Sequence, residues 1–119
     1  MINQKVLEQC RHKLVSAKSE LLNRYQAHFA DFKERENGGD EADQSVAILT
    51  ENHLFIAQQR LRTQLSEIES ALARMERGTY GICEETELPI EPERLLAIPW
   101  TRLSIEGAEI RETATPKQA

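Results

Sequence analysis

The stretch GTYGICEETELPIEPERLLAIPWTRLSIEG, residues 78–107, decides how the rest of the chain is interpreted. It opens with a Gly-x-x-Gly turn followed by Cys83, a pattern typical of a metal-binding knuckle. A structural zinc site needs four ligands, which usually arrive as two Cys-x-x-Cys pairs. The three partner positions here carry Thr86, Ser104 and Gly107. Since one thiolate cannot hold zinc alone, the stretch predicts the frame of a zinc finger without its ligands.

The composition narrows the class of protein. The chain has 119 residues, 29% of them charged and 5% aromatic, which fits one small domain with long exposed helices. A net charge of −5 argues against binding DNA through its phosphates. No apolar run is long enough to span a membrane, and the first residues have no signal-peptide core. These features predict a cytoplasmic protein.

Residues 3–35 are expected to form a first long helix. Apolar or small side chains recur at a spacing of three and four residues, which is the seam of a coiled coil. The residues of this stripe are Leu7, Cys10, Leu14, Ala17 and Leu21.

A second helix is expected over residues 43–77. Glycines at 38 and 39 stop the first helix, and the turn around them, residues 36–45, carries four acidic residues and no cation. The second helix has its own apolar stripe, formed by Val46, Leu49, Leu54, Leu61, Leu65, Ile68, Leu72 and Met75. Because the two stripes match along their length, residues 1–77 predict an antiparallel coiled-coil hairpin with its tip at about 36–45.

Residues 78–112 are expected to form a small cap. Pro92 suits the first turn of a short helix, and residues 104–112 suit a last one. The candidate core residues of the cap are Tyr80, Ile82, Leu88, Ile90, Leu95, Leu96, Ile98, Trp100 and Leu103. Residues 113–119 are expected to form a disordered tail.

The cap also resembles a known family. The positions that carry the resemblance are Tyr80, Gly81, Cys83, Ile90, Arg94, Leu95, Ala97 and Pro99. At this spacing they resemble the zinc module of the DksA/TraR family of bacterial RNA-polymerase-binding proteins. The family's remaining cysteines are replaced by Thr86, Ser104 and Gly107, so the chain looks like a zinc-independent, DksA-like branch. The resemblance implies a mainly α fold: the hairpin, a degenerate zinc-finger-like cap and a short C-terminal helix.

The resemblance further implies a transcription regulator that is not an enzyme. Such a protein binds RNA polymerase core or holoenzyme directly, enters its secondary channel and alters the stability of promoter open complexes without binding DNA. Asp40, Asp43 and Ser45 would form the tip that approaches the polymerase active site, and Arg60 would contact the channel rim. A monomer is expected.

No cofactor is expected. Zinc lacks ligands, and the positions that bind the nucleotide ppGpp in better-known relatives carry Glu67, Ile98 and Ala108, none of which is basic. Two other functions remain open from the residues alone. One is a Gre-type transcript-cleavage factor, whose hairpin tip also carries acids, and the other is a coiled-coil interaction module unrelated to polymerase.

Overall fold

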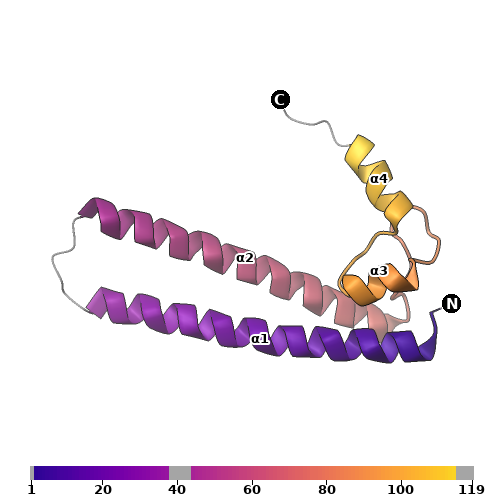
Figure 1. Cartoon of the computed structure of the whole chain (residues 1–119), viewed down its shortest axis with the longest axis horizontal. Helices are drawn as coiled ribbons and strands as arrows, with labels where there is room; N and C mark the ends of the chain where they lie inside the picture. The colour runs from indigo at the N-terminus through magenta and orange to yellow at the C-terminus, as the bar shows by residue number, and fades with distance from the viewer. Residues whose placement is uncertain (1, 38–43, 115–119) are drawn as a thin grey trace.

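The structure is a computed structural model and describes residues 2–37 and 44–114. Within these ranges lie four α-helices: α1 (Gln4–Asn37), α2 (Gln44–Arg77), α3 (Pro92–Ala97) and α4 (Ile105–Ala114). α1 and α2 are antiparallel, and α3, α4 and their connections form a cap beside the end of α2 (Figure 1). The predicted fold class is confirmed. The radius of gyration is 18.9 Å, against about 13–14 Å for a globular chain of this length, because the hairpin projects far from the cap.

Local capping explains where α1 begins and where α2 ends. Near the start of α1, the Asn3 Oδ1 atom accepts a hydrogen bond from the Lys5 backbone N–H at 2.9 Å. α2 ends at Gly78, whose φ of 78° is a left-handed conformation that favours glycine. The Thr79 N–H then donates to the Arg74 carbonyl at 3.0 Å, and the Gly78 N–H to the Met75 carbonyl at 3.3 Å. This Schellman arrangement turns the chain sharply out of α2 and into the cap.

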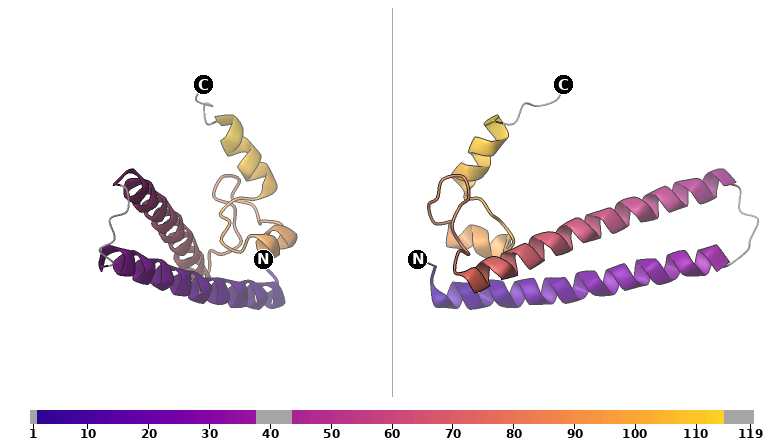
Figure 2. Two further views of the ribbon diagram at one scale, coloured as in Figure 1. Left: turned by 60° about the vertical axis from the view of Figure 1, so that its left-hand side comes forward. Right: turned by 180° about the vertical axis from the view of Figure 1, so that it is seen from behind.

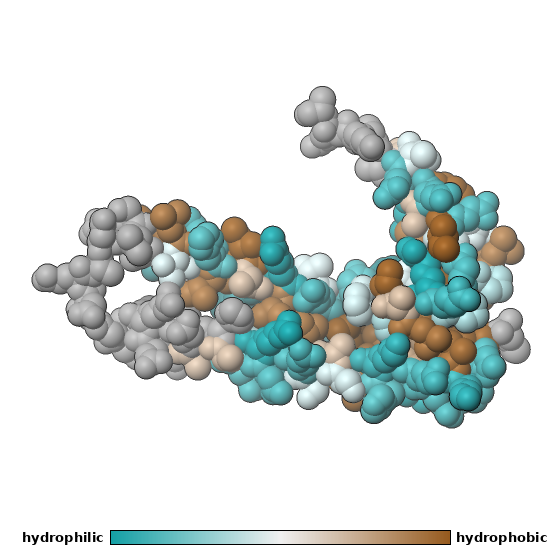
Figure 3. Space-filling model, in the orientation of Figure 1, coloured by the Kyte–Doolittle hydropathy of each residue, from teal (hydrophilic) through white to brown (hydrophobic). Residues whose placement is uncertain are grey.

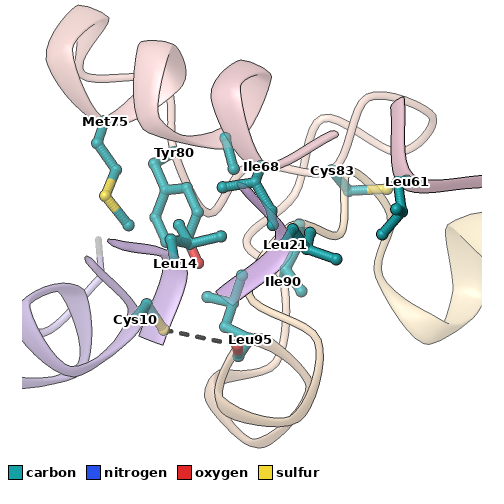
Figure 4. Close-up of a cluster of buried hydrophobic side chains, with 11 residues drawn as sticks. Cys10, Leu14, Leu21, Leu61, Ile68, Met75, Tyr80, Cys83, Ile90 and Leu95 are labelled. Carbon is teal, nitrogen blue, oxygen red and sulfur yellow. Dashed lines mark hydrogen bonds between the residues drawn. The ribbon is translucent and has the colours of Figure 1, made fainter. Parts of the chain in front are cut away.

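One continuous core joins the base of the hairpin to the cap (Figure 4). Its buried members come from α1, from α2 and from the cap. They are Cys10, Leu14 and Leu21, then Leu61, Ile68, Ala71 and Met75, then Tyr80, Cys83, Ile90 and Leu95. The two stripes predicted from the sequence therefore supply most of the hairpin's share of this core.

The outer part of the second stripe departs from the prediction. Leu49 was expected in the seam, but 58% of its surface is exposed. At 3.6 residues per turn, Leu49 lies about 120° around α2 from the buried Leu61, so it does not share the side of α2 that packs on α1. Figures 1 and 2 also show that α1 and α2 meet beside the cap and diverge away from it. The Val46 side chain falls outside those that the structure describes.

The cap core is smaller than predicted. Tyr80, Ile90 and Leu95 are buried, whereas Ile82, Leu88 and Trp100 are 41%, 58% and 39% exposed. Two short backbone segments and two short helices offer too little surface to cover all nine candidates. α4 continues to Ala114, two residues past the expected boundary, and residues 115–119 of the expected tail lie outside the described residues. None of the described helices is long and apolar enough to cross a membrane.

Candidate functional site

A tight knuckle follows α2 and forms the heart of the cap. An antiparallel bridge pairs Ile82 with Pro89. On either side of this bridge, the Cys83 N–H donates to the Leu88 carbonyl and the Ile90 N–H donates to the Gly81 carbonyl, both at 2.8 Å. These bonds return the chain on itself within ten residues and hold the Cys83 side chain toward α4.

The four positions singled out in the sequence lie together at this knuckle. The Thr86 N–H donates to Cys83 Sγ at 3.5 Å, and the Gly107 N–H donates to Ser104 Oγ at 3.0 Å. A Cβ atom added at Gly107 would lie closer than 3.0 Å to Cys83 Sγ. Only 1% of Cys83 is exposed. α4 is therefore seated directly on the Cys83 sulfur, through a residue without a side chain.

The surroundings of Cys83 shift its acidity. Burial raises the pKa of the thiol, but hydrogen bonds from Ser104 and Thr86 outweigh this effect and lower the pKa to about 6. Donors aimed at the sulfur favour the thiolate over the thiol.

Two arginines join the cap to α2. The guanidinium of Arg74, a buried side chain, donates to Ser70 Oγ at 2.9 Å and to the carbonyls of Trp100 and Thr101 at 3.2 and 3.4 Å. Burial lowers the pKa of Arg74, and repulsion from Arg102 lowers it further. These bonds tie the backbone at Trp100 and Thr101 to α2 and supply acceptors for the buried guanidinium of Arg74.

Arg102 extends the same joint toward α4. Its Nε atom lies 3.5 Å from a Glu67 carboxylate oxygen, and its Nη1 atom lies 3.7 Å from Glu84. Arg111 of α4 continues the series, with Glu84 at 3.5 Å and Glu85 at 3.1 Å. Because these groups are a third or more exposed, each pair contributes little to stability, and their main effect is to fix orientation.

α1 also holds the cap. The Cys10 thiol donates to the Leu95 carbonyl at 3.5 Å, and Lys13 Nζ donates to the Leu96 carbonyl at 2.7 Å. Tyr80, buried between the helices and the cap, donates its hydroxyl to the Pro99 carbonyl at 2.8 Å. Burial raises the pKa of this phenol, so it remains a donor across the ordinary pH range.

Of the predicted tip and rim residues, Arg60 is the one whose side chain the structure describes. Asp40 and Asp43 lie outside the described residues, and Ser45 lies in the first turn of α2 with its side chain outside those described. Arg60 is exposed on the outer side of α2, where it lines a shallow groove. The other lining residues are Phe55, Ile56, Gln59, Thr63 and Gln64.

The three positions considered for ppGpp remain without a basic residue. Glu67 pairs with Arg102, while Ile98 and Ala108 are half-buried in the cap.

Sequence reasoning missed two features of α2, the buried Arg74 and the groove beside Arg60. Arg74 stands beside the predicted stripe, and its charge hid the fact that it is buried. The run Leu54-Phe55-Ile56 placed one residue in the stripe and left two large apolar residues on another side of the same helix. That excess was the available signal for the groove.

Known proteins share this architecture over nearly the whole chain. The structure of transcription factor DksA2 from Pseudomonas aeruginosa superimposes with a TM-score of 0.87 at 31% identity, covering 94% of this chain and 87% of that one. The RNA polymerase-binding transcription factor DksA of Caulobacter vibrioides is 36% identical over 112 residues, which cover 93% of this chain and 79% of the relative. An uncharacterised protein of Aquifex aeolicus is also 36% identical over 112 residues, covering 91% and 77%. Residues 78–112 match the family described as the prokaryotic dksA/traR C4-type zinc finger.

The projecting hairpin with a cap at its base defines a class of helical, non-enzymatic transcription regulators of the DksA type. The chain belongs to the DksA/TraR family.

The family match corrects one prediction. We expected no cofactor, but the region that matches is a C4-type zinc finger, so the expectation that zinc plays no part here is wrong. The residues of this chain do not fit a four-sulfur site, because three of the four positions carry Thr86, Ser104 and Gly107. Among the described residues, no group of three His, Cys, Asp or Glu side chains could hold a metal ion. The contacts around Cys83 in this structure come from those three residues instead.

Proposed function

We propose that this protein binds RNA polymerase directly and regulates transcription by inserting its hairpin into the secondary channel. The observation that carries the proposal is the length of the hairpin relative to its cap. α1 and α2 each contain 34 residues, so each helix is about 51 Å long at 1.5 Å per residue. Two paired helices are narrow enough to enter a channel, while the cap at one end would stop at its rim.

Sequence similarity supports polymerase as the partner. The Caulobacter vibrioides relative is named as an RNA polymerase-binding transcription factor. A net charge of −5 suits contact with a basic protein surface better than contact with DNA. In this proposal the protein acts as a cytoplasmic monomer and does not touch DNA.

The tip residues would act near the polymerase active site. Asp40 and Asp43 bring carboxylates, and Ser45 brings a hydroxyl, to the end of the hairpin. Carboxylates in a charged cleft can accept bonds from basic side chains or perturb the field of a bound metal ion. By these contacts the tip would change the lifetime of promoter open complexes. Arg60 would contact the rim from the side of α2.

The test measures binding and effect separately. Affinity for core RNA polymerase is measured by fluorescence anisotropy, and open-complex lifetime is measured at a ribosomal-RNA-type promoter. Asp43→Asn is expected to bind within about twofold of the wild type and lose the effect on lifetime. Arg60→Ala is expected to weaken binding by about tenfold or more, as for loss of a close charge pair.

Matched controls remove the same charges elsewhere. Glu112→Gln on α4 and Arg11→Ala on α1 alter exposed residues outside the proposed contacts. Both should behave as the wild type. If the wild-type protein fails to bind core polymerase, the proposal is wrong, and the hairpin serves another partner. Cleavage of the transcript in stalled complexes would instead assign a Gre-type activity.

A further inference from the structure

We propose that Ser70 of α2, with Arg74 and Arg102, forms a latch that fixes the angle between the hairpin and the cap and so positions the hairpin on RNA polymerase. This inference rests on the proposed function and adds a positioning site to it. Figure 3 shows the cap standing out from the hairpin as a separate lobe, and the ribbons in Figure 1 and Figure 2 place it on the side of α2. The latch lies where this lobe meets α2.

The segment that carries Arg102, residues 99–103, is tied to several parts of the joint between hairpin and cap. It contains neither helix nor strand, yet each of its five carbonyl groups accepts a hydrogen bond. The donors are Tyr80 to Pro99, Arg74 to Trp100 and Thr101, the Glu84 N–H to Arg102, and Arg94 to Leu103. An irregular segment takes its position from such partners. Residues 99–103 therefore connect the position of α2 to that of the knuckle and α3.

One hydroxyl group joins the two sides of this joint. Arg74 Nη1, from the next turn of α2, and Arg102 Nη2, from the cap, both donate to Ser70 Oγ at 2.9 Å. Arg102 Nε is buried and makes no hydrogen bond with the residues that the structure describes. The Ser70 hydroxyl is therefore the hydrogen-bond acceptor that fixes the Arg102 side chain against α2.

The charges at the latch make this hydroxyl group necessary. Burial lowers the pKa of Arg74, and repulsion from Arg102 lowers it further, so the two guanidinium groups need a shared acceptor to stay together. Glu67 and Glu84 lie 3.5 and 3.7 Å from Arg102, but these ion pairs are more than a third exposed and hold their geometry weakly. Without the Ser70 acceptor, Arg102 would lose its fixed direction, and residues 99–103 would lose one tie to α2.

A small change at this joint moves the far end of the hairpin by a large distance. α2 has 34 residues and is about 51 Å long at 1.5 Å per residue, so a tilt of about 5° at the cap shifts its far end by about 4 Å. Groups that act at an active site tolerate misplacement of about 1 Å poorly. The latch is thus a positioning site. It touches no reacting group, but it sets where the hairpin points when the cap sits on the rim.

The first measurement uses the free protein. Spin labels carried by unnatural amino acids at Ser19 on α1 and Glu109 on α4, both exposed, report the angle as a distance in double electron–electron resonance. Ser70→Ala removes the acceptor and should shift or broaden that distance, although alanine is the better helix former. Ser66→Ala, which changes an exposed serine one turn earlier on α2, is the matched control and should leave the distance unchanged. Ser70→Thr keeps a hydroxyl group and should give the wild-type distance.

The second measurement uses RNA polymerase and separates effect from affinity. Ser70→Ala is expected to reduce the effect on open-complex lifetime by about 2–30-fold. It should reduce affinity for core polymerase by less, because the tip and rim side chains are all retained. Ser66→Ala and Ser70→Thr should behave as the wild type, and circular dichroism should show equal helix content in all variants.

The possible results distinguish failure of the latch from failure of the proposed function. An unchanged distance in Ser70→Ala, or an equal change in Ser66→Ala, overturns the latch. A shifted distance with an undiminished effect on open-complex lifetime overturns the positioning role and leaves the proposed function standing. If the wild type does not bind polymerase, the proposed function fails and the positioning role fails with it, whereas the distances in the free protein still decide whether the latch fixes the cap.

Discussion

Replacing Gly107 by alanine should destabilise the protein, although alanine is the better helix former. The added Cβ would lie closer than 3.0 Å to Cys83 Sγ, with Ser104 Oγ at 3.3 Å and the Glu85 Cβ at 3.4 Å. The backbone fixes the position of the added Cβ, so the clash can be relieved only if α4 or the knuckle shifts. Overpacking of this kind costs about 1–3 kcal/mol. The helix propensity gained is about 0.5–1 kcal/mol, which leaves a net loss of about 1–2 kcal/mol.

A double-mutant cycle can separate the cost of the contact with Cys83 Sγ from the gain in helix propensity. Cys83→Ala removes the sulfur that the new methyl group would meet. Gly107→Ala made in that background should therefore cost clearly less than in the wild type, since only the milder contacts with Ser104 Oγ and the Glu85 Cβ remain to oppose the gain in helix propensity. The free energy of unfolding is measured with urea for the four proteins, following helix content and Trp100 fluorescence in parallel. Equal costs for Gly107→Ala in both backgrounds, or a gain in the wild-type background, would refute the close contact.

Three further predictions concern the joint and the knuckle. Glu87 adopts a left-handed φ of 60°. Glu87→Gly should relieve this strain and raise the free energy of urea unfolding by about 1 kcal/mol. A lower free energy of unfolding would contradict the left-handed conformation. Arg74→Met keeps most of the side-chain volume but removes the donors to the Trp100 and Thr101 carbonyls. It should lower the free energy of unfolding by about 2–4 kcal/mol in the same assay. The control Arg77→Met, which changes an exposed residue of the same helix, should cost little. Cys83 has a lowered pKa of about 6 in the folded state, so its contribution to stability is fully present above the unfolded thiol's pKa and is lost as the pH falls through about 6. In chelated buffer the wild type should thus gain stability between pH 6 and pH 9 relative to Cys83→Ala, and parallel pH profiles for the two proteins would count against the shift.

The hairpin was predictable because its driving force is periodic. Leu14, Leu21, Leu61 and Ile68 recur at coiled-coil spacing, and all four are buried. The prediction for Leu49 was wrong, because this residue departs from the spacing of the stripe and lies about 120° around α2 from the buried Leu61.

The cap was less predictable because its contacts are specific rather than periodic. The four knuckle positions were identified from their spacing, and the structure brings them together as that spacing implies. The prediction about zinc was wrong: it rested on the replacement of three family cysteines by Thr86, Ser104 and Gly107, whereas residues 78–112 as a whole match a C4-type zinc finger family. The burial of Arg74 could not be read from the sequence, because it depends on carbonyls almost thirty residues away along the chain.

The contact between Cys10 and Leu95 has a consequence for how the protein is made. The two residues are 85 positions apart in the chain, and synthesis at about 5–20 residues per second places several seconds between them. During that interval α1 has left the ribosome, while the groups that cover its first turns have not yet been made. Until α3 is made, Cys10 and its apolar neighbours on α1 lack the cap residues that cover them, so a chain that stops short of α3 would expose this part of the stripe to aggregation.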